Sequence, residues 1–375
     1  MSAVETDIRI ALIGCGRVAG HHLRSIAQVP GGRIVAVCDL DAAKAQAYAE
    51  QYGIRWFTNY HTMFAAMPEI DVAAVITPSG MHFEHGMEIL GRYRKHLIVE
   101  KPTFMRPAQV DAAFDLAEGL GLRIFPVFQN RHNKAVRRVK AAIDGGELGD
   151  IRIMAIRVRW CRPQRYYDLA PWRGTFSHDG GALSNQGIHH IDLLRHLGGG
   201  VRTVSATLRT LGAAIEVEDT AVATLTYATG AVGVVEVTTA ARPTDYEASL
   251  SIVGSLGLAQ LGGLAVNELQ VFTPDPQACV AASEAIPDAY GFGHTTVYEN
   301  VVADLRGERP FPVDRHDCRS SLRLLHAFYR SDEATDGVEV EADAQSTRLG
   351  RPDDTLSALY RTPQPTSVPS EPVNG

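Results

Sequence analysis

The sequence lacks the features that mark several classes of protein. Its five cysteines form no C-x-x-C pair and are odd in number, which argues against a zinc site or a disulfide framework. No apolar run is long enough to span a membrane, and the polar start MSAVETD has no signal-peptide core. Basic residues are not in excess, because 36 Lys and Arg stand against 43 Asp and Glu. We therefore expect a cytoplasmic protein with no membrane or nucleic-acid partner.

The N-terminal third alternates between two local patterns. Five apolar runs rich in Val and Ile are followed by turn residues, as expected of strands buried on both faces of a parallel sheet. Amphipathic stretches that end near a glycine lie between them. Together these units predict a doubly wound parallel sheet with helices on both faces. The runs are residues 8–14, 33–39, 71–78, 96–102 and 122–128.

The middle of the chain predicts a second and different sheet. Strand-like runs there follow one another with short turns and mostly without helices, which favours antiparallel pairing. An open sheet of this kind leaves an apolar face, so we expect a homodimer or homotetramer. We expect domains at residues 1–126 and 127–334, and a flexible, polar, Pro/Ser-rich tail at 335–375. The predicted strand regions are 151–160, 201–210, 220–240 and 246–263.

The first apolar run ends in a glycine-rich turn that resembles a dinucleotide-binding loop. Gly14 and Gly16 follow the run and precede a helical pattern, which would allow a pyrophosphate to approach the helix N-terminus. Asp39 ends the second run, where a carboxylate accepts hydrogen bonds from a ribose and repels a 2′-phosphate. We therefore expect NAD rather than NADP. The alternative is a strand–turn–helix unit that binds no ligand.

Two further strand ends lie on the same predicted edge of the sheet. One carries Thr77, Ser79 and His82, whose alternative role is to cap a helix. The other carries Glu100 and Lys101, and the following proline biases Lys101 toward an extended conformation that directs its side chain into the crevice. The alternative for Lys101 is an ordinary surface lysine.

Residues 180–200 form the second candidate site. Asn185 and His189 share one face of a predicted helix, and Asp192 is spaced to orient His189 for proton transfer. A metal site made of His189, His190, Asp192 and His196 is an alternative, although the spacing matches no known zinc pattern. A helix cap followed by solvated histidines is another, and we predict no bound metal.

Taken in order, these motifs resemble the glucose-fructose oxidoreductase / inositol dehydrogenase / MocA family. The resemblance rests on Gly14-x-Gly16, Asp39, Glu100-Lys101-Pro102 and residues 180–192, GGALSNQGIHHID. It implies a Rossmann domain followed by an open, mostly antiparallel sheet, and hydride transfer between NAD(P) and a sugar or polyol. It also implies that Lys101 and His189 are the catalytic pair. The cofactor-binding candidates are then Gly14, Gly16, Arg17, Val18, Asp39, Thr77, Ser79, His82, Glu100, Lys101 and Gln129.

One departure from the family pattern concerns the substrate. Most members have Asp four residues before the histidine, whereas this chain has Asn185, which can bind a hydroxyl but cannot take a proton. With Arg131 in FQNRHNKAV, this resembles the branch that oxidises C3 of UDP-N-acetylglucosaminuronate or UDP-N-acetylglucosamine. An excess of arginine over residues 151–173 suits carboxylates and phosphates, and its alternative is a solvated strand edge. The substrate-binding candidates are Asn185, Arg131, Arg165, Tyr166, Trp172 and Arg173.

The leading hypothesis is therefore an NAD-dependent dehydrogenase of a nucleotide sugar. Other hypotheses keep the chemistry and change the substrate to a free sugar, inositol or an antibiotic-pathway keto-sugar. An NAD-dependent glycosidase, or a protein that binds the cofactor without catalysis, is also compatible with the motifs.

Overall fold

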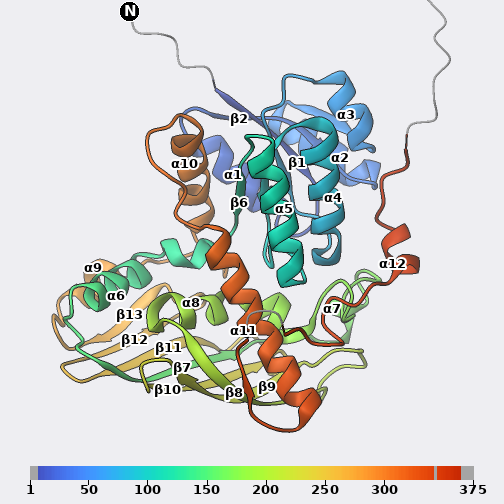
Figure 1. Ribbon diagram of the computed structural model, residues 1–375. Coiled ribbons are helices and arrows are strands. Elements are labelled where there is room, and N and C mark those ends of the chain that lie inside the picture. Colours follow the sequence, from blue (N-terminus) through green and yellow to red (C-terminus); the bar gives the residue numbers. More distant parts are fainter. Residues whose placement is uncertain (1–6, 342–343, 365–375) are drawn as a thin grey trace, which may run out of the picture.

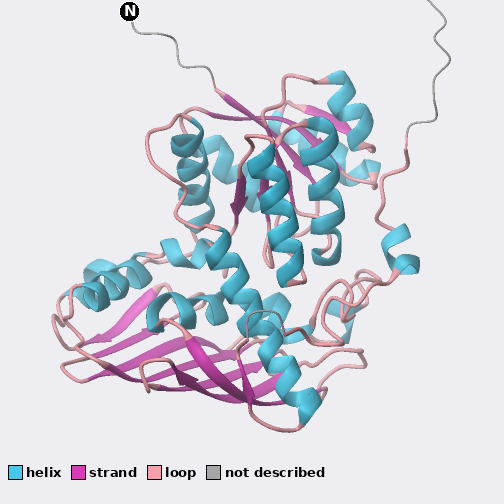
Figure 2. Ribbon diagram, viewed as in Figure 1, coloured by secondary structure: helices cyan, strands magenta, loops and turns pink. Residues whose placement is uncertain are grey.

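The computed structural model describes residues 7–341 and 344–364 and contains two sheets (Figure 1). Figure 2 shows the smaller sheet with its helices above the larger sheet, whose own helices lie on the side facing the first domain. A doubly wound parallel sheet combined with a mostly antiparallel one confirms the predicted fold class.

The first sheet consists of six parallel strands in the order β3-β2-β1-β4-β5-β6. Five of them were predicted from apolar runs. The exception is the edge strand β3, which spans three mostly exposed residues and therefore has no apolar run to reveal it. The strands are β1 (Ile8–Ile13), β2 (Gly32–Cys38), β3 (Arg55–Phe57), β4 (Val72–Val75), β5 (His96–Val99) and β6 (Ile124–Pro126).

Helices with recognisable end signals connect these strands. At the start of α2, the Asp41 carboxylate accepts hydrogen bonds from the Ala43 and Lys44 amides, and Gly53 ends the helix in a left-handed conformation. Pro107 begins α5, where its missing N–H is not needed. The helices are α1 (Ala19–Gln28), α2 (Ala42–Tyr52), α3 (Tyr60–Ala66), α4 (His82–Glu88) and α5 (Pro107–Gly119).

The second sheet has eight strands in the order β13-β12-β11-β7-β10-β9-β8-β14. All neighbours are antiparallel except β7 and β10. In β9 every second residue is buried, because only one face is covered by helices. The strands are β7 (Ile151–Arg159), β8 (Val201–Arg209), β9 (Thr220–Tyr227), β10 (Val232–Thr238), β11 (Glu247–Gly254), β12 (Leu258–Gly262), β13 (Glu268–Phe272) and β14 (Val338–Glu339).

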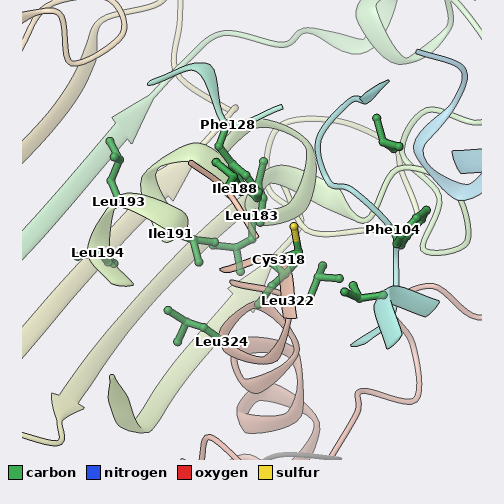
Figure 3. Packing of buried hydrophobic residues seen from close by; sticks show 14 of the residues in the cluster. Phe104, Phe128, Leu183, Ile188, Ile191, Leu193, Leu194, Cys318, Leu322 and Leu324 are labelled. Atoms are coloured by element: carbon green, nitrogen blue, oxygen red, sulfur yellow. The ribbon is translucent and has the colours of Figure 1, made fainter. Parts of the chain in front are cut away.

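A continuous apolar core joins this sheet to the first domain. Cys318 and Leu322 of the long helix α11 share one cluster with Ile191 and with Phe104, which follows β5 (Figure 3). Among the described residues, no helix is both long and apolar enough to cross a bilayer. The remaining helices are α6 (Lys134–Asp144), α7 (Gln164–Tyr167), α8 (Ile188–Gly198), α9 (Ala278–Ala282), α10 (Gly293–Leu305), α11 (Arg315–Ala334) and α12 (Asp354–Ala358).

Helix α10 packs on the first sheet although it lies far along the chain. Its residues Val297, Tyr298 and Val301 join the cluster around Ile10 and Leu23. We propose that the domain boundary stays between residues 126 and 127 and that α10 is an element of the second segment that returns to the first domain.

The C-terminal segment differs from the expected flexible tail over its described part. Leu349 is fully buried, and Arg348 pairs with Asp332 and Glu333 of α11. Farther along, Arg361 pairs with Glu84 of α4. Apolar burial and ion pairs therefore hold this polar stretch along both domains. The expectation for residues 365–375 lies outside the described residues.

Candidate active site

The glycine-rich turn lies between β1 and α1 and has the shape that a dinucleotide requires. Gly14 has φ +102°, and a Cβ there would lie 2.7 Å from the Ile76 carbonyl oxygen, so only glycine fits. Gly16 and Arg17 are exposed, and open space surrounds the position of a Gly16 Cβ. No side chain caps the start of α1 at Val18, and the exposed backbone of Gly16 and Arg17 just before it is the part of the turn open to a phosphate, since amides of the first helical turn donate to the Gly16 and Val18 carbonyl oxygens.

Asp39 lies beside this turn at the end of β2. Its carboxylate accepts hydrogen bonds from the Cys15 amide at 2.7 Å and from the Asp41 amide at 2.8 Å. These contacts fix a negative charge next to the turn, as the predicted role in ribose binding requires.

The second strand end places its predicted residues differently. Thr77 is half-buried at the edge and contacts His85, and Ser79 is buried. His82 is 1% exposed, and its two ring nitrogens contact the carbonyl oxygens of Thr77 and Pro102 at 2.9 Å each. We therefore propose that His82 ties two strand-end loops together, in place of the expected contact with the cofactor.

Glu100, also expected at the cofactor, has its carboxylate engaged by neighbouring groups of the protein. Its carboxylate is held by His22 at 3.1 Å, His294 at 3.3 Å and the Lys101 amide at 3.0 Å. Burial by itself would raise the pKa of Glu100, but the hydrogen bonds from the two histidines outweigh it and keep this pKa well below its usual value. A buried carboxylate thus fixes the backbone immediately before Lys101.

The same cluster is where the described residues come nearest to a metal site. The ligand atoms of His22, Glu100 and His294 lie within 4.8 Å of one another. The contacts are already satisfied as hydrogen bonds, and Tyr298 takes the second nitrogen of His22 at 2.8 Å. The residues considered above for a metal, His189, His190, Asp192 and His196, do not form such a group in the described part of the chain.

Lys101 reaches across the domain junction. Its Nζ donates a hydrogen bond of 2.7 Å to the carbonyl oxygen of Asn185, which belongs to a π-helical turn (Ala182–Gln186) just before α8. Burial lowers the pKa of Lys101 from its usual value. The amine is therefore held against the segment that carries His189, as the catalytic hypothesis requires.

The buried carboxylate of Glu218 supports the π-helical turn. Gly181 has φ +82°, and a Cβ there would overlap the Glu218 carboxylate, so the glycine lets that carboxylate approach. Glu218 accepts hydrogen bonds from the Leu183 amide and the Tyr329 hydroxyl, and burial raises its pKa to about 8. These contacts fix the position of the turn.

His189 is buried and keeps one ring nitrogen unpaired. Its Nε2 contacts the Gln129 amide nitrogen at 3.1 Å, whereas its Nδ1 has no partner. Burial and the charge of Lys101 hold the pKa of His189 well below its usual value, so the imidazole is neutral and can accept a proton. Gln129, expected at the cofactor, thus contacts the candidate catalytic histidine.

The expected pairing of His189 with Asp192 is wrong. Asp192 instead forms a two-pronged ion pair with Arg131, both contacts measuring 2.6 Å. Arg131 is 6% exposed and also contacts Asp317 at 3.0 Å. Its donors thus already face the buried Asp192 and the partly buried Asp317, and we propose a structural role for Arg131 in place of the predicted one in substrate binding.

Asn185 has both ends of its side chain engaged. Its Nδ2 donates to the buried Asp179, and its Oδ1 accepts from Gln186 at 2.6 Å. We therefore assign its side chain to the support of the turn rather than to a substrate hydroxyl. Asp179 and Gln186 escaped the sequence analysis, although Asp179 directly precedes the glycine pair that marked the motif.

Arginines and aromatic rings gather at the junction of the two domains. The guanidinium of Arg173 lies 4.4 Å from the Tyr166 ring and 4.6 Å from the Trp172 ring. Arg162 and Arg17 face the same Tyr166 ring at 5.6 and 5.4 Å. The cluster thus includes Arg17 from the glycine-rich turn, and it is suited to an anionic ligand with planar groups.

Two details of this cluster differ from the sequence-based selection. Arg165 is exposed and is not among the arginines that face Tyr166. Arg162 was not selected, although it faces Tyr166 and contacts Gln186 at 3.3 Å. The direction of each side chain in an irregular loop cannot be read from the sequence, which explains why Arg165 was chosen as a candidate and Arg162 was not.

Comparison with known proteins gives matches over both domains. A model of the oxidoreductase family with an NAD-binding Rossmann fold matches residues 8–128, and a model of the GFO/IDH/MocA C-terminal domain matches residues 136–260. The WlbA dehydrogenase of Bordetella pertussis, solved with NADH and UDP-GlcNAcA, is 36% identical. It has a TM-score of 0.84 over 89% of this chain and 98% of that one.

Two further relatives extend the comparison. The WlbA dehydrogenase of Chromobacterium violaceum, solved with the same two ligands, is 35% identical, with a TM-score of 0.84 over 91% of this chain and 98% of that one. The scyllo-inositol 2-dehydrogenase (NAD(+)) of Bacillus subtilis is 25% identical over 92% of this chain and all of its own length.

Proposed function

The chain belongs to the GFO/IDH/MocA oxidoreductase family and is an NAD-dependent sugar oxidoreductase, and from this premise we propose that it oxidises C3 of a UDP-N-acetylglucosamine-type nucleotide sugar. The uronate form of this sugar is the substrate that we expect it to prefer. The observation that carries the proposal is the placement of Lys101 against the turn that precedes His189, beside the arginine–aromatic cluster. A proton acceptor and an anion-binding surface therefore meet at one junction.

The cofactor fits the first domain. The space at Gly14 and Gly16, the uncapped start of α1 and the Asp39 carboxylate match the pyrophosphate and ribose of NAD. When bound, NAD supplies the hydride acceptor. Everything else in the reaction is the task of the protein's own side chains.

Lys101 and His189 provide the proton chemistry. A sugar hydroxyl placed at this junction can give its proton to a neutral Lys101 amine or to Nε2 of His189, the ring nitrogen that accepts the Gln129 amide hydrogen bond before substrate arrives. The Lys101 ammonium also stabilises negative charge that develops on the oxygen. Burial and the charge of Lys101 lower the pKa of His189, so a protonated Lys101 opposes protonation of the imidazole.

Substrate recognition is assigned to the arginine–aromatic cluster. Arg173 offers a fork-shaped donor for a carboxylate or diphosphate, while Tyr166 and Trp172 offer flat surfaces for a sugar or uracil. Arg162 adds positive charge beside Tyr166 but is itself paired with Asp245 at 2.8 Å. The two WlbA structures hold UDP-GlcNAcA, a ligand of this chemical class.

A substrate panel tests the proposal. NADH formation is measured by absorbance with UDP-N-acetylglucosaminuronate, UDP-N-acetylglucosamine, myo-inositol and glucose. We expect the uronate to be preferred over UDP-N-acetylglucosamine by about 10- to 100-fold in kcat/KM, the value of one charge-assisted contact. Turnover of inositol or glucose without turnover of either UDP-sugar would contradict the nucleotide-sugar assignment. Cleavage of a glycoside without net NADH would instead indicate a hydrolase.

We also propose that the open face of the second sheet forms an interface between copies of the chain. Val222, Val232 and Val234 are 44–52% exposed on adjacent strands, and Ile153 of β7 pairs with Val232. Exposed aliphatic side chains on adjacent strands of one sheet face favour a subunit contact there. Light scattering is expected to show a dimer or tetramer, and the double variant Val222→Glu/Val234→Glu should shift it toward monomer. The matched variant Val280→Glu, exposed on α9, should leave the mass unchanged. A monomeric wild type would disprove this.

A further inference from the structure

Asp179 is a buried carboxylate at the centre of the site that has no role so far. It is 2% exposed and lies in the loop before the glycine pair. The Gly174 amide donates to its Oδ2 at 2.7 Å, and the Asn185 side chain donates to its Oδ1. Both oxygens are therefore held in place by the protein itself.

Through Asn185 this carboxylate is connected to Lys101. The residue whose amide donates to Asp179 is the same one whose carbonyl oxygen accepts the Lys101 amine at 2.7 Å. Displacing Asp179 would release the Asn185 side chain, and the carbonyl under Lys101 would then lose one of its restraints.

Asp179 also balances charge. The groups that act on the Lys101 amine are the carboxylates of Glu100 and Asp179, which raise its pKa, and the guanidinium groups of Arg162 and Arg173, which lower it. Since Glu100 is turned toward His22 and His294, Asp179 is the carboxylate on the side of the π-helical turn.

The surroundings of Asp179 determine when it is charged. Burial raises its pKa to about 6, against the opposing effect of the Gly174 amide, Arg173, Asn185 and Lys101. Other titratable groups that sense its charge are Glu218, Tyr166, Tyr167 and Tyr329. Above about pH 6 the carboxylate is therefore an anion.

We propose that Asp179 is a positioning residue of this dehydrogenase site, which holds Asn185 beneath Lys101 and supplies the negative charge that balances the Lys101 ammonium. The inference rests on the proposed function for its catalytic meaning, but its structural content does not depend on any substrate. Position 185 in the π-helical turn is an asparagine and carries no charge. The carboxylate next to the turn comes instead from Asp179, in the loop that precedes it.

Labelling of Lys101 tests the charge balance without a substrate. Acetic anhydride reacts with the neutral amine, so the pH dependence of Lys101 acetylation, measured by peptide mass spectrometry between pH 7 and 11, reports its titration. We expect Asp179→Asn to move the midpoint to lower pH by about one unit, as the loss of a nearby opposite charge does. Asp179→Glu, which keeps the charge, should restore most of the wild-type midpoint.

The control for this test is Asp168→Asn, which makes the same charge change at an exposed position after α7. It should leave the midpoint where it is in the wild type. An identical midpoint in wild type and Asp179→Asn overturns the proposal, and so does an equal shift in the Asp168 variant.

Kinetics test the positioning part. Asp179→Asn should lower kcat by about 10-fold or more, and in an Asn185→Ala background the same change should have a much smaller effect, because coupled residues are not additive. Equal effects in both backgrounds would mean that Asp179 does not act through Asn185. If the wild type oxidises no sugar of the panel, the proposed function fails, whereas the labelling result still decides the role of Asp179.

Discussion

Lys101→Ala is expected to lower kcat about 10²- to 10⁴-fold, the range that a positioned proton-transfer group contributes. The amine of Lys101 lies at the domain junction, donates to the Asn185 carbonyl oxygen and faces the segment that carries His189. Binding of NADH, measured by fluorescence titration, should stay within about threefold of the wild type, because the glycine-rich turn and Asp39 are untouched.

Lys95→Ala is the matched control for this variant. Lys95 precedes the opposite end of the same strand, β5, and its Nζ donates to the Pro68 carbonyl oxygen at 2.7 Å. Its replacement should leave kcat near the wild-type value. Near-normal turnover of Lys101→Ala would remove Lys101 from the reaction and leave His189 as the proton acceptor.

Arg131→Ala is expected to lower the free energy of unfolding by about 3–5 kcal/mol, since it removes the main counter-charge of the buried Asp192, which keeps only the Ser321 hydroxyl at 2.8 Å and Arg195 at 3.9 Å. The Arg131 guanidinium joins Asp192, which is 1% exposed, and Asp317 of α11. Denaturant unfolding followed by circular dichroism measures the change. The loss is expected to be structural, because Arg131 ties α8 to α11.

Two further variants distinguish a structural role of Arg131 from a role in substrate binding. Arg165→Ala, at an exposed position, should change stability by about 0.5 kcal/mol or less. Arg131→Met combined with Asp192→Leu removes the Arg131–Asp192 pair and should recover part of the lost stability, which also keeps the test informative if Arg131→Ala does not fold. Wild-type stability of Arg131→Ala together with a raised KM would restore the original substrate-binding prediction.

The general architecture was predictable because its signals are local. Continuous apolar runs, periodic stretches and the glycines that end them depend on residues close in the chain, and they located five of the six strands of the first sheet. Strand β3 escaped because three exposed edge residues carry almost no pattern. The return of α10 to the first domain also escaped, since periodicity shows that a helix has an apolar face but not which surface covers it.

The residue types of the site were largely visible, whereas their partners were not. The sequence places Glu100, Arg131 and His82 in or beside the motifs of the expected site. In the structure their side chains contact His294, Asp317 and the Pro102 carbonyl oxygen, respectively. Such contacts join distant segments, and a strand end or helix turn can direct a charged side chain inward or outward with the same backbone.

By itself, the sequence determined the alternation of strands and helices, the glycine-rich turn with Asp39, and the presence of a lysine and a histidine suited to proton transfer. Only the tertiary structure decided which partner each buried carboxylate has: Asp192 contacts Arg131, Glu100 contacts two histidines, and Asp179 contacts the Asn185 amide beneath Lys101. The reason is physical. Backbone geometry follows from neighbouring residues, but a buried charge is placed by whichever distant partner offsets the loss of its water.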